Sequence, residues 1–588
     1  MHNYIFDAAT NGLLLQAEEI NPVACKEPRP VYAEEMDLLG FGRVFDYPRD
    51  TGLPLMWSEQ TGYFYKGVKI AKLKSSEFVE MPEVVRLDNL FSAERLMPCN
   101  IAAMTESNRR YLEALADTAI ARVRKYYEEY KDKADLVWCA FSGGKDSMVL
   151  LDIVQRALPH DAFKVFFTNT HMEYPDTYQY IDTIRKWCAE RQIDFIVCES
   201  DKVPEETWRE FGPPATRIRW CCSVHKTAPQ MLKAREIAGK PDIRTFSFVG
   251  VRASESLTRS AYDFLCKSKK HNGEDTLNAI LEWNSAEVWL YLYMRNLPIN
   301  PAYAKGNKRV GCLLCPGATK RAEYITEQCY PAAYHRFYQY IKDAYDPIVT
   351  TTGKIDDPSL GNIWVARKNG NGLLIPCTYE DIKRDDDTWV LTCREQRADW
   401  REWIKTIGVL QNDKSPYSIK YKSGIYTFSV SETPAAGLEV RAADLHTKEC
   451  KSFIKMLKQV FRKAACCVMC RVCEADCPYG CLSMTGGRVH ISDKCHHCSG
   501  CHKPLMGCHV YHSLQKRRGA YVFYEAWEER CRQRRVSAAN AAVISPTRTQ
   551  SGLTANCWAR EHKNLCVSGI LRSSSALRST CFVLKLKS

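Results

Sequence analysis

The sequence predicts an α/β protein, a doubly wound parallel sheet with a small N-terminal β module and a C-terminal cysteine-rich α+β domain. Three observations predict it. Between residues 101 and 345, short apolar runs alternate with stretches of helical period, which is typical of a parallel sheet covered on both faces. Residues 1–100 show the two-residue alternation of antiparallel strands. Residues 461–515 carry cysteines at metal-ligand spacing.

The chain has 588 residues, too many for one hydrophobic core. We expect five parts: a β-rich module (1–100), an α/β domain (101–345), an α+β linker domain (346–460), a cysteine-rich domain (461–515) and a disordered tail (516–588).

Composition limits the cellular setting. Residues Met1–Glu19 include acidic side chains and no long apolar core, so we expect no signal peptide. No run has the roughly eighteen apolar residues that a membrane span needs. We therefore expect a cytoplasmic protein without membrane contact, in which most of the 28 cysteines cluster as metal ligands rather than as disulfides.

The net charge of +13 comes mostly from one end of the chain. Arg532–Ser588 holds ten Lys/Arg and one Glu, which leaves about +4 for the rest. Such a weak basic excess permits a nucleic-acid partner but does not argue for one.

Local patterns place the elements. In the N-terminal module we expect strands over Leu53–Trp57, Gly62–Lys66 and Val68–Lys72. In the α/β domain we expect helices over Thr105–Tyr130, Pro175–Arg191 and Ala228–Ala238, and strands over Leu136–Phe141, Phe163–Thr168, Ile193–Cys198 and Arg244–Val251.

A glycine-rich turn joins the first of these strands to the helix that follows. It consists of Ser142, Gly143, Gly144, Lys145, Asp146 and Ser147. Glycines let backbone N–H groups approach an anion, and the helix start adds a favourable field. Lys145 supplies a positive charge, the serines supply hydroxyl groups, and Asp146 could orient Mg²⁺ or a substrate hydroxyl. We predict a phosphate site with Lys145 and Asp146 as candidate catalytic residues.

This turn lacks the Gly-x4-Gly-Lys-Ser/Thr spacing of the common NTPase loop. It resembles the SGGxDS loop (PP-loop) of the ATP pyrophosphatase and phosphoadenosine phosphosulfate (PAPS) reductase superfamily, with its adenine nucleotide alpha-hydrolase-like fold. Asn169–Asp176 is similar to that family's DTGxxFPET segment, and Gly250–Ser256 with Arg259 is similar to GxRxxES…R. The resemblance implies that Arg252 and Arg259 bind phosphate or sulfonate and that the ligand is ATP, PAPS or adenosine phosphosulfate (APS).

Two cysteine pairs stand out in the same domain. Cys221 and Cys222 are adjacent, and Cys312 and Cys315 form a CxxC unit. Four soft thiolates suit either iron–sulfur or structural zinc. The set resembles the CC…CxxC ligands of a [4Fe–4S] cluster in APS reductases, which favours the cluster.

One part of the family pattern is missing. Sulfonucleotide reductases use a nucleophilic cysteine in a Glu-Cys-Gly-x-His context, whereas the nearest candidate here, Cys329, lies in Glu-Gln-Cys-Tyr-Pro. Without a positioned thiolate, attack on sulfur has no evident agent.

The second cysteine-rich stretch has ferredoxin spacing. Cys467, Cys470, Cys473 and Cys477 follow C-x2-C-x2-C-x3-C-P, a run whose fourth cysteine binds the other cluster of a pair. We therefore predict a two-cluster ferredoxin-like domain. One [4Fe–4S] cluster is assigned to Cys467, Cys470, Cys473 and Cys508, and the other to Cys495, Cys498, Cys501 and Cys477. Zinc is the alternative, which two interleaved triplets disfavour.

Three functions remain open. The first is a redox enzyme, an oxidoreductase or sulfur transferase of the PAPS reductase type, that couples an adenine (sulfo)nucleotide to electrons from a donor protein or reductase. The second is an ATP pyrophosphatase that activates a nucleic acid for thiolation, which the missing thiol favours. The third is an iron–sulfur redox sensor that binds nucleotide without turnover.

Overall fold

The structure is a computed structural model of the full chain. It describes residues 1–74, 82–87, 91, 94–216, 219–267, 273–352, 364, 379–385, 388–393, 396–433, 437–443 and 447–502. The chain divides into two compact units, Met1–Arg517 and Arg518–Ser588, and every described residue belongs to the first. The tail predicted over 516–588 and the predicted ligand Cys508 therefore lie outside the described residues.

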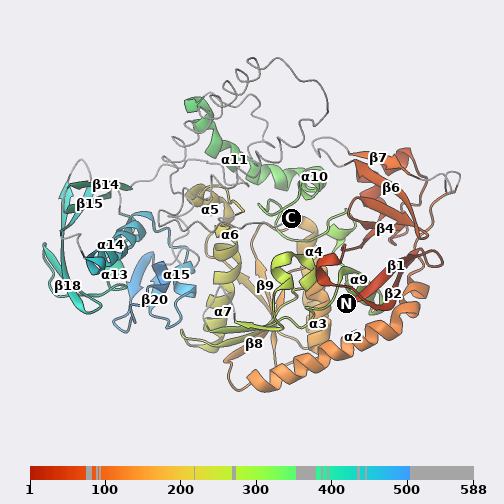
Figure 1. Cartoon of the computed structure of the whole chain (residues 1–588), viewed down its shortest axis with the longest axis horizontal. Coiled ribbons are helices and arrows are strands. Elements are labelled where there is room, and N and C mark those ends of the chain that lie inside the picture. The colour runs from red at the N-terminus through yellow and green to blue at the C-terminus, as the bar shows by residue number, and fades with distance from the viewer. Residues whose placement is uncertain are drawn as a thin grey trace, which may run out of the picture. The chain divides into compact units, whose positions relative to one another are not determined.

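A six-stranded sheet of order β10-β9-β8-β11-β13-β12 forms the centre of the first unit (Figure 1). All its pairings are parallel except that of β12 with β13. The strands are β8 (Leu136–Phe141), β9 (Lys164–Asn169), β10 (Phe195–Glu199), β11 (Thr245–Phe248), β12 (Leu265–Lys267) and β13 (Glu274–Leu277). The predicted parallel sheet is thus confirmed, and the sequence patterns missed its last two strands.

Helices cover this sheet on two faces. They are α2 (Ile101–Tyr130), α3 (Lys145–Ala157), α4 (Pro175–Ala189), α5 (Pro204–Phe211), α6 (Trp220–Cys222), α7 (Ala228–Ala238), α8 (Leu257–Ser260), α9 (Ser285–Met294), α10 (Lys320–Cys329) and α11 (Pro331–Thr352). Helices α2, α3 and α9 pack on one another, whereas α7 packs against β9 and β10. Figure 1 shows α7 and the α2–α3 pair on opposite sides of β8 and β9.

Helix α2 begins four residues before the predicted start. The Asn100 side chain accepts a hydrogen bond from the N–H of Ala103 at 3.1 Å, and this N-cap satisfies a donor that the first turn leaves free. The capping signal was therefore present in the sequence, upstream of the apolar period.

The N-terminal residues contribute to two different cores. Strands β1 (His2–Asp7) and β2 (Gly12–Glu19) form a hairpin on α2, where Asn108 bonds to the backbone of Leu13 and Leu15 at 2.8 and 2.7 Å. This hairpin shares the main core rather than that of the β module. Because its apolar side chains alternate like those of the module, sequence patterns could not separate them.

The β module itself is a five-stranded antiparallel sheet with a separate apolar core. Its elements are η1 (Pro22–Ala24), β3 (Arg29–Val31), α1 (Ala33–Leu38), η2 (Phe41–Arg43), β4 (Met56–Glu59), β5 (Gly62–Tyr65), β6 (Val68–Lys74) and β7 (Glu83–Arg86). The three predicted strands correspond to β4, β5 and β6.

After α11 the chain forms a six-stranded antiparallel sheet and a short cysteine-rich region. The elements are β14 (Tyr379–Asp385), β15 (Thr388–Cys393), α13 (Trp400–Ile404), β16 (Val409–Leu410), β17 (Tyr417–Tyr421), β18 (Gly424–Thr433), β19 (Gly437–Ala443), α14 (Lys448–Cys466), α15 (Val472–Ala475), β20 (Leu482–Thr485), β21 (Arg488–Ile491) and η6 (Gly500–His502). Among the described residues, no helix is long and apolar enough to cross a membrane.

Candidate functional site

The glycine-rich turn lies where β8 ends and α3 begins. Gly143 has φ of +77°, and a Cβ on it would lie 3.0 Å from Thr177 Cγ2, so a side chain there would be strained and crowded. Ser147 Oγ accepts from the Ser142 N–H at 3.2 Å and donates to the Gly144 carbonyl at 2.8 Å. These contacts fix the loop ahead of the first turn of α3.

The segment after β11 lies directly against this turn. A Cβ on Gly250 would lie 3.0 Å from the Asp146 carbonyl oxygen and 3.2 Å from the Ser147 nitrogen. Only a glycine leaves room for so close a backbone approach. The approach brings the buried Arg252 side chain to α3, where its Nε donates to Asp146 Oδ1 at 2.5 Å.

Lys145 and Asp146 form a buried charge pair with Arg252. Lys145 Nζ donates to Asp146 Oδ2 at 2.7 Å. Burial alone would raise the pKa of Asp146, but the charges of Arg252 and Lys145 outweigh it and hold that pKa well below its ordinary value. Burial and then Arg252 lower the pKa of Lys145. The predicted residues Lys145, Asp146 and Arg252 are therefore brought together.

The second predicted arginine is not part of this group. Arg259 lies on α8, and its guanidinium pairs with Glu255. Glu255 in turn accepts a hydrogen bond from the Arg252 N–H at 3.1 Å. Among the described residues, Arg259 is therefore connected to the glycine-rich turn (Ser142–Ser147, below called the anion loop after its predicted ligand) only indirectly, through Glu255 and the Arg252 N–H.

Three residues that sequence reasoning missed complete the loop's surroundings. Asn300 Nδ2 donates to the Gly143 carbonyl at 3.0 Å, and Tyr303 OH accepts from the Lys145 N–H at 2.9 Å. Both belong to a segment that begins before η5 (Pro301–Tyr303). Glu27 of the N-terminal segment pairs with Arg252 Nη2 at 2.6 Å. No local motif marks these residues, because only tertiary packing brings them to the loop.

The four cysteines predicted in this domain share one region. Cys221 and Cys222 lie on α6, and Cys312 forms an isolated β-bridge with Glu173, just beyond the end of β9. Its neighbour Leu313 donates to the Met172 carbonyl at 2.8 Å. A hydrogen bond to Cys222, burial, and the charges of the other thiols raise the pKa of Cys221. Burial, Glu173 and the neighbouring thiols raise the pKa of Cys312 to about 12.

The cysteine region lies at the same sheet edge as the glycine turn. Strands β8 and β9 are parallel neighbours in which Phe141 pairs with Phe167, so the loops that follow them start side by side. Carboxyl ends of parallel strands are where such folds bind ligands. Lys226 belongs to the cysteine region, with Nζ 3.7 Å from Glu173 Oε1. Burial would lower the pKa of Lys226, but Cys312 and Glu173 raise it well above its ordinary value.

The ferredoxin-spaced cysteines form a second region. Cys477, Cys495, Cys498 and Cys501, one of the two predicted ligand sets, line a small cavity of about 20 Å³. In the other predicted set, Cys473 Sγ accepts a hydrogen bond from Lys463 Nζ at 2.9 Å. The fourth member of that set, Cys508, lies outside the described residues.

Four cysteine sulfurs around one cavity fit an iron–sulfur cofactor in donor chemistry. Within the described part of the chain, no three His, Cys, Asp or Glu side chains form a group that could hold a single metal ion.

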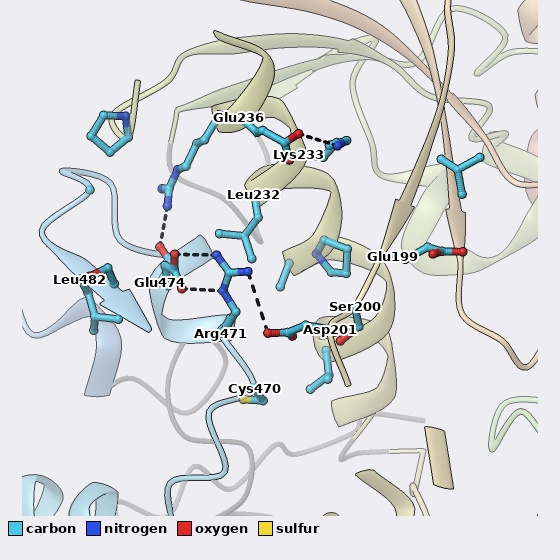
Figure 2. A pocket seen from close by; sticks show the side chains of 18 of the residues that line it. Glu199, Ser200, Asp201, Leu232, Lys233, Glu236, Cys470, Arg471, Glu474 and Leu482 are labelled. Carbon is cyan, nitrogen blue, oxygen red and sulfur yellow. Dashed lines mark hydrogen bonds and ion pairs between the residues drawn. The ribbon is translucent and has the colours of Figure 1, made fainter. Parts of the chain in front are cut away.

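A larger cavity of about 970 Å³ lies where the ferredoxin-spaced region meets α7 (Figure 2). Arg471 pairs with Glu474 at 2.8 Å and approaches Asp201 at 4.0 Å. Arg235 donates from α7 to the carbonyls of Glu474 and Cys477 at 2.6 and 2.7 Å. Helix α7, which follows Cys222 in the chain, is thus hydrogen-bonded to the backbone of Cys477, a predicted cluster ligand.

The fold and the turn define an α/β class with a strand–glycine–helix loop at the carboxyl edge of its parallel sheet. The family model for the phosphoadenosine phosphosulfate reductase domain matches residues 136–318. An adenosine 5′-phosphosulfate reductase of Bacillus mycoides is 30% identical over 195 residues, which are 32% of this chain and 75% of the relative. Through this domain the chain belongs to the PAPS reductase family.

Other similarities are broader or weaker. An uncharacterized protein of Methanocaldococcus jannaschii is 27% identical over 280 residues, or 47% of this chain and 65% of the relative. A second one from that organism is 30% identical over 269 residues, covering 52% of its length. The chain therefore spans less than two thirds of these relatives. The crystal structure of a PAPS reductase from Candida auris is 19% identical with a TM-score of 0.26, covering 34% of this chain and 94% of the other.

Proposed function

We propose that this protein is a reductase-type enzyme that binds a nucleotide phosphosulfate at the Ser142–Ser147 loop and couples it to electron transfer from iron–sulfur clusters. The observation that carries the proposal is one shared sheet edge. It holds the anion loop with Lys145 and Arg252, and next to it the region of Cys221, Cys222 and Cys312. Family membership supports a reductase-type activity.

The chain's own residues would bind and orient the substrate. Backbone N–H groups of the loop, the Lys145 ammonium and the Arg252 guanidinium stabilise anionic oxygens. Reduction of a phosphosulfate takes two electrons, breaks the bond between the phosphate oxygen and sulfur, and releases sulfite together with AMP from APS or adenosine 3′,5′-bisphosphate from PAPS. Clusters held by the three cysteine sets would supply those electrons one at a time.

Cys329 does not fit the role of the family's nucleophilic cysteine. This cysteine ends α10, and burial raises its pKa, which disfavours the thiolate that a nucleophile needs. A nucleic-acid acceptor is not favoured, because residues 1–100 carry fifteen Asp/Glu against ten Lys/Arg and phosphate-rich partners prefer basic surfaces.

Anaerobic ligand binding and turnover test the proposal. The reconstituted protein is titrated with APS, PAPS and ATP by calorimetry, and sulfite is measured in the presence of a chemical one-electron donor. We expect APS or PAPS to bind and sulfite to be released only when the donor is present. Pyrophosphate release from ATP without sulfite formation would replace the proposal with the pyrophosphatase function.

A further inference from the structure

Glu27 holds Arg252 in the way an anionic ligand would. Arg252 Nη1 and Nη2 donate to its two carboxylate oxygens at 2.9 and 2.6 Å. Ser254 Oγ adds a third hydrogen bond at 2.6 Å. A bidentate contact of this kind is also how a guanidinium binds phosphate or sulfonate. The outer edge of Arg252 is therefore already occupied.

The charges around the loop are balanced. Two cations, Lys145 and Arg252, face two carboxylates, Asp146 and Glu27. An anionic ligand is attracted only weakly by a group whose charges cancel. For the ligand to bind tightly, one of the two carboxylates has to move away from the cations. Asp146 is held by both cations from the first turn of α3. Glu27 comes from outside the sheet with 29% of its side chain exposed, so Glu27 is the one free to leave.

The segment around Glu27 is held by this contact. Glu27 has φ of +55°, a backbone conformation that is unfavourable for a residue with a Cβ. Just before it, η1 packs against η4 (Ala253–Glu255) and α8, the segment that carries Arg252 and Ser254. Loss of the ion pair would remove a contact that offsets the unfavourable backbone conformation.

We propose that Glu27 is a specificity-determining residue that competes with the substrate for Arg252, so that only a ligand with a bidentate anionic group displaces it. The proposal rests on the proposed function for the identity of the nucleotide. Displacement would release residues 22–28 from Arg252. By linkage, the Glu27–Arg252 contact weakens ligand binding, and bound ligand weakens the Glu27–Arg252 contact by the same factor.

Calorimetry of the full chain tests this with two probes, inorganic pyrophosphate and APS. We expect Glu27→Gln to bind both more tightly than the wild type, about tenfold if Arg252 is free in roughly one molecule in ten. Glu34→Gln is the control: Glu34 is exposed in the first turn of α1, outside residues 22–28, and is not among the partners of Arg252, so the affinities of this variant should equal those of the wild type.

Weaker or unchanged pyrophosphate binding in Glu27→Gln would overturn the proposal, as would the absence of pyrophosphate binding in both proteins. Tighter pyrophosphate binding without any APS binding would leave the competition intact and remove the proposed substrate. Hydrogen exchange gives a second readout that needs no variant. Residues 22–28 of the wild type should exchange faster when ligand is bound, and equal or slower exchange contradicts displacement.

Discussion

Lys145 and Asp146 show how much the surroundings of a residue determine its role. Each is part of a six-residue motif, yet the chemistry of the pair depends on Arg252, which lies more than a hundred positions away and bonds to Asp146 at 2.5 Å. Burial strengthens these contacts because little water screens them. In the structure the Ser142–Ser147 loop is therefore part of a group of charges that extends beyond its own six residues.

Removing the Lys145 charge should abolish most nucleotide binding. A charge-assisted hydrogen bond contributes about 1.5–3 kcal/mol, so we expect Lys145→Ala to weaken APS binding by roughly ten- to a hundredfold. Iron content should not change, because the side-chain partner of Lys145 is Asp146 and no cysteine in the described ranges pairs with it. Calorimetry and iron analysis of the same preparation check both points, and normal affinity would remove Lys145 from the site.

Glu35 stabilises the β module through buried charges. It accepts hydrogen bonds from Arg29 and Arg321, and from Tyr63 OH at 2.8 Å. Burial would raise its pKa, but the two arginines outweigh burial and lower the pKa from 4.5 to about 2. Glu35 thus joins the module to α10, which carries Arg321.

Because the folded-state pKa of Glu35 is depressed, its stabilisation is present above about pH 4.5 and lost as the pH falls toward 2. Glu35→Gln leaves buried arginines without a counter-charge and should cost about 3–5 kcal/mol at pH 7. The difference from the wild type should shrink at pH 3. Thermal unfolding by circular dichroism at both pH values measures this, and the exposed neighbour Glu34→Gln should show no effect.

At the scale of elements, the two cysteine triplets have the same backbone pattern. In each, the residues just before and just after the middle cysteine have positive φ: Met469 and Arg471 at +55° and +59°, and His497 and Ser499 at +51° and +59°. Such angles are uncommon for residues other than glycine. The two triplets therefore share one backbone conformation, as the predicted pair of ligand loops would require. Among the described residues, the set of Cys477, Cys495, Cys498 and Cys501 is the one that lines a cavity together.

Helix α7 connects the two cysteine regions. Besides its bonds to Glu474 and Cys477, Arg235 donates to the Ala475 carbonyl at 3.2 Å, and Figure 2 shows this side of the cavity with Arg471, Glu474 and Asp201. Arg235→Gln should cost about 1.5–3 kcal/mol of local stability, since it removes charge-assisted hydrogen bonds to three carbonyls; those of Glu474 and Cys477 keep backbone donors at 3.2 Å. We expect faster hydrogen exchange across residues 472–484. Lys233→Gln is the control, because Lys233 pairs with Glu236 on its own helix.

For the whole molecule, three cluster sites predict about twelve iron atoms and as many acid-labile sulfides per chain. Anaerobic reconstitution followed by iron and sulfide analysis measures the total. Cys221→Ser should lose about a third of the iron while both ferredoxin-type signals in electron paramagnetic resonance persist. Cys498→Ser should also lose about a third, with one of the two ferredoxin-type signals lost and the other kept. Stoichiometric zinc with no sulfide would contradict the cluster assignment.

The sequence by itself determined the parallel sheet, the glycine-rich turn between β8 and α3 and the grouping of cysteines along the chain, because period, glycine position and cysteine spacing are local properties of a chain. The predicted strands Leu136–Phe141 and Phe163–Thr168 lie at β8 and β9 within a residue. The four-cysteine set and the ferredoxin assignments remain predictions about cofactors.

Only the tertiary structure decided which charges meet. It joined Glu27 and Asp146 to Arg252 and left Arg259 paired with Glu255. It also placed the first hairpin on α2 rather than in the β module. Contacts between residues some 225 positions apart leave no trace in local pattern. They arise because neighbouring strand ends, a glycine-permitted backbone approach and buried charges satisfy one another only in the folded chain.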